Sequence, residues 1–107
     1  MTIIDKPNKR NLNHFGQKVR ELREKKGLLL RQVAAHLEVD TALMSKIETG
    51  DRNASKEQVE QIAEILVANK NELQKLWLSD KIYTTINELP QAAEEAIKYV
   101  LRNYKKK

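Results

Sequence analysis

Side chains that could carry out covalent or metal chemistry are few and scattered in this sequence. The chain has no cysteine, which excludes a disulfide framework, a thiolate metal site and a cysteine nucleophile. Its two histidines, His14 and His36, are isolated, and neither has the spacing of a metal ligand or of a base beside a nucleophile. We therefore expect a protein that is not an enzyme and that uses no metal, cofactor or small-molecule ligand.

A short helical segment instead combines side chains suited to hydrogen bonding with the edges of bases. Met44 and Ile47 have helical spacing and should face a core, which leaves the opposite side of their helix to small and polar residues. This outward set consists of Thr41, Ala42, Ser45 and Lys46. Hydroxyls donate or accept, alanine can contact a thymine methyl, and lysine can reach guanine acceptors. We expect base contacts from these four, although a merely solvated face has the same composition.

A series of short helices must position this set, because no alternating pattern is long enough for a strand. The helix starts are marked by candidate N-caps at Asn13, Asp40 and Ser55. Gly27 and Gly50 are placed to supply the left-handed residue that follows a helix end. The spacing of apolar residues predicts four helices up to about residue 66, with the third over about 41–49.

The second half of the chain predicts longer and less regular helices. A fifth helix should start near Asn71, and Ser79 with Asp80 are expected to interrupt it. Pro90 favours a fresh start, because proline is tolerated in a first helical turn. The sequence therefore predicts an all-α fold.

The second and third helices are separated by a tight turn, and the third is capped at both ends. This geometry can present a helix to the major groove of DNA, although an ordinary helical hairpin has the same lengths. The residue pattern favours the first interpretation. The segment LRQVAAHLEVDTALMSKIETG, Leu30 to Gly50, resembles the helix-turn-helix of the phage repressor and Cro-like regulators, the xenobiotic-response-element family. The resemblance extends from about Phe15 to Leu76 and implies a five-helix repressor-like bundle, here followed by a C-terminal helix.

The sequence departs from this family's pattern at three positions. The family usually caps the second helix with Ser or Thr and begins it with Gln, where this chain has Leu29 and Leu30. The phosphate contact of that Gln is therefore in doubt, and Leu30 should pack with Val33 and Leu37 or touch a thymine methyl. Glu38 stands where the family places a turn glycine, in a conformation that costs a non-glycine residue about 1 kcal/mol.

Contacts with phosphate should come from the edges of the motif, where basic and polar side chains flank the outward set. We expect them from Lys18, Arg31, Thr49, Arg52 and Asn53.

Glu48 should turn inward, because a carboxylate directed at the phosphate backbone would oppose binding. Helical spacing places it beside Met44 and Ile47, and a carboxylate at the edge of a core requires a partner. Arg23 follows Val19 by four residues and so lies near the inward face of the first helix. The resemblance supports an ion pair of Arg23 with Glu48, since family members often join Arg and Glu at the matching positions.

Charge is concentrated at the two ends of the chain. The net charge is +5, with +5 in residues 1–26 and +3 in residues 90–107. Basic ends suit a polyanionic partner, but solvated tails have the same pattern. We expect a flexible basic arm over 1–12, a DNA-binding domain over 13–78, and a C-terminal helical extension over 79–107.

No stretch of the sequence is apolar enough for a membrane segment. The longest unbroken apolar run, Ile65 to Ala68, is far shorter than the roughly 20 residues that cross a bilayer. The expectation is a cytoplasmic protein without a membrane partner.

The last helix has an apolar stripe that the bundle does not need for its own core. The stripe is formed by Ile97, Val100, Leu101 and Tyr104. An exposed stripe of this kind usually marks an interface, so we expect a homodimer, although folding back onto the first and fifth helices is an alternative. A two-fold dimer would place two third helices in successive major grooves of a palindromic operator.

These expectations describe a sequence-specific regulator of transcription that binds double-stranded DNA, of the repressor type. The alternative is a protein-interaction adaptor or an antitoxin that uses the same fold. A net charge of −1 over residues 27–53 gives this alternative some support. A controller of a restriction-modification operon, a prophage-type repressor and an autoregulating antitoxin all remain open, because fold-level resemblance does not choose among them.

Overall fold

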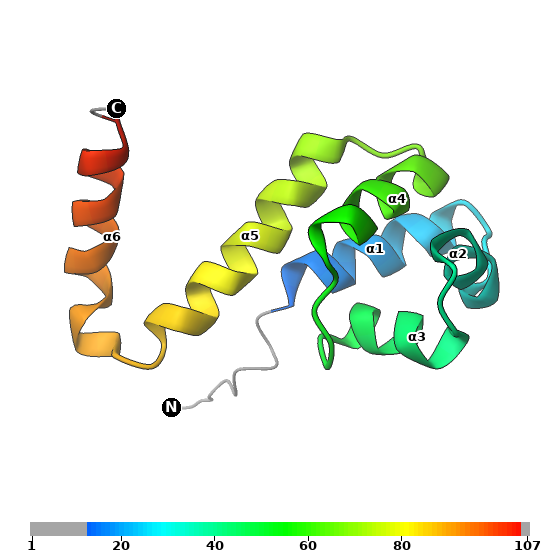
Figure 1. The fold of residues 1–107 in the computed structure, drawn as a ribbon, viewed down its shortest axis with the longest axis horizontal. Helices are drawn as coiled ribbons and strands as arrows, with labels where there is room; N and C mark the ends of the chain where they lie inside the picture. Colours follow the sequence, from blue (N-terminus) through cyan, green and yellow to red (C-terminus); the bar gives the residue numbers. More distant parts are fainter. Residues whose placement is uncertain (1–12, 106–107) are drawn as a thin grey trace.

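The computed structural model describes residues 13–105, and over that range it consists of helices joined by turns and loops (Figure 1). The six helices are α1 (His14–Lys25), α2 (Leu30–Leu37), α3 (Thr41–Thr49), α4 (Lys56–Leu66), α5 (Lys70–Ile86) and α6 (Pro90–Lys105). This arrangement confirms the predicted all-α bundle with a C-terminal helix. The predicted arm over 1–12 lies outside the described residues. No described helix is long and apolar enough to span a membrane.

Local capping explains where most of these helices begin. The side chains of Asn13, Asp40 and Ser55 each accept a hydrogen bond from a backbone N–H in the first turn that follows. Gln58 completes the capping box of α4, since its side chain accepts from the backbone N–H of Ser55 at 2.9 Å. Helix α2 has no such cap, because Leu29 has no acceptor. Gln32 Oε1 compensates from the third helical position by accepting from the Leu29 N–H at 2.7 Å.

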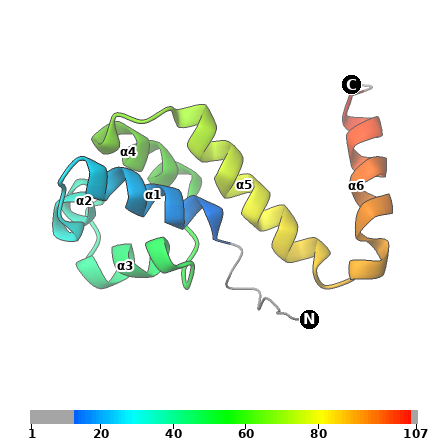
Figure 2. The same cartoon turned by 180° about the vertical axis from the view of Figure 1, so that it is seen from behind.

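The first four helices and the beginning of α5 surround one apolar core (Figure 2). The buried hydrophobic residues are Phe15, Val19, Val33, Ala34, Leu37, Met44, Ile47, Ala54, Val59, Ile62, Ala63, Leu66 and Leu73. Leu30 is half-buried and packs against this core, as the first of the two roles predicted for it requires. The shared core therefore fixes the orientation of α2 relative to α3.

Helix α5 differs from the prediction, since it continues through Ser79 and Asp80 to Ile86 and begins at Lys70, one residue earlier than expected. The interruption was wrong because a tertiary contact outweighs the weak helix propensity of aspartate. Asp80 Oδ2 accepts from the backbone N–H of Phe15 at 2.9 Å, and its Oδ1 lies 3.1 Å from His14 Nδ1. The carboxylate therefore satisfies a free donor in the first turn of α1.

Helix α6 stands away from the bundle and has no buried residue (Figures 1 and 2). It begins at Pro90, as predicted. Its apolar stripe remains exposed, so the structure does not support the alternative in which this segment folds back onto α1. The end of α5 leads from the bundle to α6, and the predicted domain boundary at residue 78 falls inside this continuous helix.

Two non-glycine residues adopt the left-handed conformation at helix ends. Glu38 ends α2 with φ 60°, and Val67 ends α4 with φ 50°. The predicted strain at Glu38 is therefore present, and Val67 adds a second strained site. A β-branched side chain is the less suited of the two to this conformation.

We predict that Val67→Gly stabilises the protein by about 1 kcal/mol, because glycine adopts positive φ without the Cβ clash and Val67 buries little surface at 81% exposure. Urea unfolding followed by circular dichroism measures the change. Ala35→Gly, at an exposed position inside α2, is the control and should destabilise by a similar amount. A destabilising effect of Val67→Gly would contradict the assignment of strain at this helix end.

Candidate nucleic-acid interface

Helix α3 presents the predicted base-contacting set on the side opposite the core. Thr41, Ala42 and Lys46 are exposed and Ser45 is half-buried. The inward side of α3 buries Met44, Ile47 and Glu48. Asp40 Oδ1 accepts from the backbone N–H of Leu43 at 2.7 Å and fixes the first turn of the helix. The structure therefore brings the four side chains together on one accessible face.

Glu48 is the only buried charged residue in the described part of the chain, and Arg23 of α1 neutralises it. Arg23 Nε donates to Glu48 Oε2 at 2.7 Å, and Nη2 donates to Oε1 at 3.2 Å. A third bond runs from Arg23 Nη1 to the carbonyl oxygen of Leu28 at 2.9 Å. The pairing with Glu48 raises the pKa of the Arg23 guanidinium against the opposing effect of burial. The two-point contact is geometrically specific, so it sets the rotation of α3 about its axis.

Asn13 provides a second tie between α1 and α3 that sequence reasoning identified only as an N-cap. Its Nδ2 donates to the backbone carbonyl of Glu48 at 2.7 Å, while its Oδ1 accepts from Gly16 N at 3.2 Å. The two helices approach so closely that a Cβ on Gly16 would clash with the carbonyl oxygen of Glu48. A Cβ on Gly50 would lie 2.8 Å from Asn13 Cγ, and φ there is +89°. No sequence pattern predicts the contact between Asn13 and Glu48, because the two residues are 35 positions apart.

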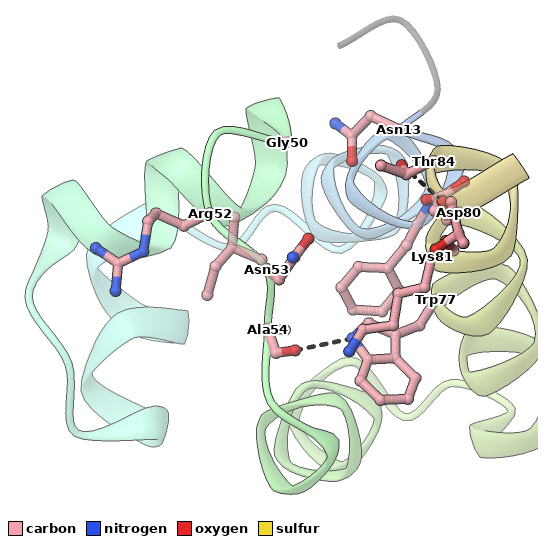
Figure 3. A pocket seen from close by; sticks show the side chains of 12 residues that line it. Asn13, Gly50, Arg52, Asn53, Ala54, Trp77, Asp80, Lys81 and Thr84 are labelled. Atoms are coloured by element: carbon pink, nitrogen blue, oxygen red, sulfur yellow. Dashed lines mark hydrogen bonds between the residues drawn. The ribbon is translucent and has the colours of Figure 1, made fainter. Parts of the chain in front are cut away.

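Three of the predicted phosphate contacts lie together at the end of α3 and in the loop that follows it. Thr49 Oγ1 lies 3.2 Å from both the Lys46 carbonyl oxygen and Asp51 Oδ2. The backbone N–H of Arg52 donates to the same carbonyl at 3.2 Å, which folds the loop back against the helix. Arg52 and Asn53 are exposed. In Figure 3 the Arg52 side chain extends to the opposite side of the loop from Trp77.

The other two predicted phosphate contacts come from separate helices. Arg31 is exposed in the first turn of α2. Lys18 on α1 is half-buried, and its Nζ lies 3.7 Å from Glu21 Oε1. An exposed pair of this kind is weak enough to exchange its partner for a phosphate.

A pocket that no sequence pattern predicts lies between α5 and the loop that follows α3 (Figure 3). Its volume is about 600 Å³, and Asn53, Trp77 and Lys81 are among the side chains that line it. Trp77 Nε1 donates to the carbonyl oxygen of Ala54 at 2.8 Å. Lys81 Nζ lies 4.4 Å from the centre of the Trp77 ring. The hydrogen bond of Trp77 attaches the loop after α3 to α5, and Lys81 of the same helix packs over the indole ring.

Acidic and histidine side chains do not gather into a metal site. Over residues 13–105, no group of three or more such side chains is placed to hold a metal ion. Each histidine has one carboxylate neighbour: His14 Nδ1 lies 3.1 Å from Asp80 Oδ1, and His36 Nε2 lies 3.2 Å from Glu64 Oε1.

Comparison with known proteins agrees with this geometry. The family described as "Helix-turn-helix domain" matches residues 14–76, so the chain belongs to that family. Among solved structures, the clp gene regulator ClgR from C. glutamicum has a similar fold, with a TM-score of 0.55 and 24% sequence identity. The superposition covers 69% of this chain and 94% of that one. No curated protein matches the sequence.

We predict that Arg23 and Glu48 are strongly coupled. Arg23→Met or Glu48→Gln alone should lower the free energy of unfolding by about 3 to 5 kcal/mol. Each change leaves a buried partner without its ion pair, since the Arg23 side chain is 12% exposed and the Glu48 side chain is 5% exposed. The double variant should lose less than the sum of the two, and urea unfolding of all four proteins gives the coupling energy.

Arg20 and Glu24 on the surface of α1 provide the control cycle, with side chains 61% and 58% exposed. Their coupling should not exceed about 0.5 kcal/mol. Equal coupling in the two cycles would reject a structural role for the buried pair.

Proposed function

We propose that this protein is a sequence-specific DNA-binding regulator of transcription that inserts α3 into the major groove. The observation that carries the proposal is the rigid presentation of one α3 face. Thr41, Ala42 and Lys46 are exposed, while Glu48 of the same helix is buried and held by Arg23. Membership of the helix-turn-helix family supports it, because the second helix of that motif enters the groove. The likeness to a protein named as a gene regulator agrees with this function.

The charges around α3 suit contact with a phosphate backbone on both sides of the groove. Arg31 precedes α3 on the previous helix, and Arg52 follows it in the loop, each with an exposed side chain. The carboxylate of Glu48 is withdrawn into the ion pair, so it does not repel phosphate. Base contacts would specify the sequence, and these flanking cations would position the helix.

The proposed active form is a two-fold dimer held through α6 and acting on a palindromic operator. The α6 stripe leaves apolar surface in water, with Ile97 44%, Val100 63%, Leu101 52% and Tyr104 73% exposed. Exposed apolar groups along one helix face are typical of an interface. A single recognition helix covers only a few base pairs, so two of them are needed for a site of useful length.

Lys46→Ala tests the base contact after an operator has been selected from a pool of random duplexes. We expect the native protein to bind the selected duplex with a Kd on the order of 10⁻⁸ M and to lose affinity steeply as salt rises. Lys46→Ala should cost about 1 to 3 kcal/mol on that duplex and less on random DNA, as measured by fluorescence anisotropy.

Lys75→Ala is the matched control, because Lys75 is an exposed lysine on α5. It should bind as the native protein does. Equal losses for Lys46→Ala on both duplexes would assign Lys46 to phosphate alone. Failure of the pool to yield any preferred duplex would reject the regulator in favour of an adaptor or antitoxin.

Sedimentation velocity tests the dimer. The full chain should sediment as a dimer at tens of micromolar, and a chain ending at Ile86 should be monomeric because it lacks the α6 stripe. That shorter chain keeps every buried core residue, since the last of them is Leu73. A monomeric full chain, or a shorter chain that still dimerises, would contradict the proposed interface.

A further inference from the structure

The apolar side of α6, on which Ala93 is half-buried and Ile97, Val100 and Tyr104 are exposed, has the spacing of a helical seam rather than of scattered apolar residues. Ala93, Ile97, Val100 and Tyr104 follow one another at intervals of four, three and four residues. This is the repeat with which two helices pack side by side. Leu101 lies at the edge of the same stripe. Ala93 and Tyr104 are 11 residues apart, so the seam provides four layers of contact over a length of about 16 Å.

The sizes of the seam residues are unequal at the two ends of the helix. The smallest, Ala93, is near the start of α6, and the largest, Tyr104, is near its end. Parallel pairing with a second copy would place alanine opposite alanine and tyrosine opposite tyrosine. Antiparallel pairing about a point between Lys98 and Tyr99 places Ala93 opposite Tyr104 and Ile97 opposite Val100. Large against small fills each layer evenly, so the sizes favour the antiparallel direction.

The charges of α6 favour the same direction. Residues 90–97 have a net charge of −2, and residues 98–105 have a net charge of +3. Parallel pairing would put like charges side by side over the whole helix. Antiparallel pairing sets the acidic half of one copy beside the basic half of the other, with Glu94 on the same flank as Lys105 of the second copy.

We infer that α6 packs antiparallel against α6 of a second copy of this chain, with Ala93 against Tyr104 and Ile97 against Val100 across a two-fold axis at the middle of the helix. The inference rests on the dimer of the proposed function and specifies its geometry. The two-fold axis then relates the two α3 helices, as a palindromic operator requires. Helix α5 is continuous from the bundle to the turn before α6, so it connects this axis to the DNA-binding unit.

Disulfide formation tests the direction of pairing, because the native chain has no cysteine. Ala93→Cys and Tyr104→Cys are made separately in the full chain, mixed, allowed to exchange and oxidised. The inference expects a disulfide between the two different variants in the mixture, since Cα atoms in one layer come close enough to be bridged. It expects no dimer of Ala93→Cys with itself, because those two positions lie about 16 Å apart along an antiparallel pair.

The control uses Glu95→Cys and Arg102→Cys, which lie at nearly the same heights on the opposite face of α6. Their mixture should not form a disulfide. A self-linked Ala93→Cys dimer would overturn the inference in favour of parallel pairing. A dimeric chain that gives no disulfide in the Ala93 and Tyr104 mixture would overturn it and leave the proposed dimer standing. A monomeric chain would overturn both, whereas DNA binding is measured independently of this result.

A second measurement leaves the seam intact. Spin labels are attached through Gln91→Cys or Lys98→Cys, two positions on one flank of α6 that are seven residues apart. Antiparallel pairing gives a longer distance between copies at Gln91 than at Lys98, because the axis passes beside Lys98. Equal distances at the two positions would overturn the inference.

Discussion

The buried pair of Arg23 and Glu48 is the constraint on which the orientation of α3 depends. A carboxylate that is 5% exposed is tolerated only where its charge is matched, and here two guanidinium nitrogens satisfy its two oxygens. Because Glu48 follows Ile47 directly, its fixed position also fixes which side of α3 faces the core. The outward position of Ala42 and Lys46 is a consequence of this inward contact rather than of any preference of their own.

A second set of polar contacts extends the same rigidity along the chain. Asn13 ties the start of α1 to the end of α3, and Asp80 ties that same turn of α1 to α5. Trp77 completes the connection by holding the carbonyl of Ala54 in the loop that follows α3. Asn13 and Asp80 satisfy backbone groups that the helix ends leave unpaired, and Trp77 satisfies a loop carbonyl. The bundle is therefore joined to α5 by directional bonds in addition to apolar packing.

The exposed faces of α3 and α6 differ in their chemistry. The α3 face is small, polar and flanked by arginines, which suits hydrogen bonding to a charged polymer. The α6 face is apolar along one stripe and has opposite charges at its two ends, which suits a second copy of the same helix. Neither surface is part of the core, so substitutions on either one can be made without altering the fold.

The sequence by itself determined the helices, most of their caps and the side of α3 that faces outward, because these follow from spacing within a few residues. It also predicted the ion pair of Arg23 with Glu48, once the family pattern was added to the spacing. The roles of Asn13, Asp80 and Trp77 were decided only by the tertiary structure. The bonding partner of Trp77 is 23 positions away in the sequence, that of Asn13 is 35 away and that of Asp80 is 65 away. No local sequence pattern encodes contacts over such separations. Asp80 shows the physical reason, because its bond to a distant helix outweighed the local preference that predicted a break.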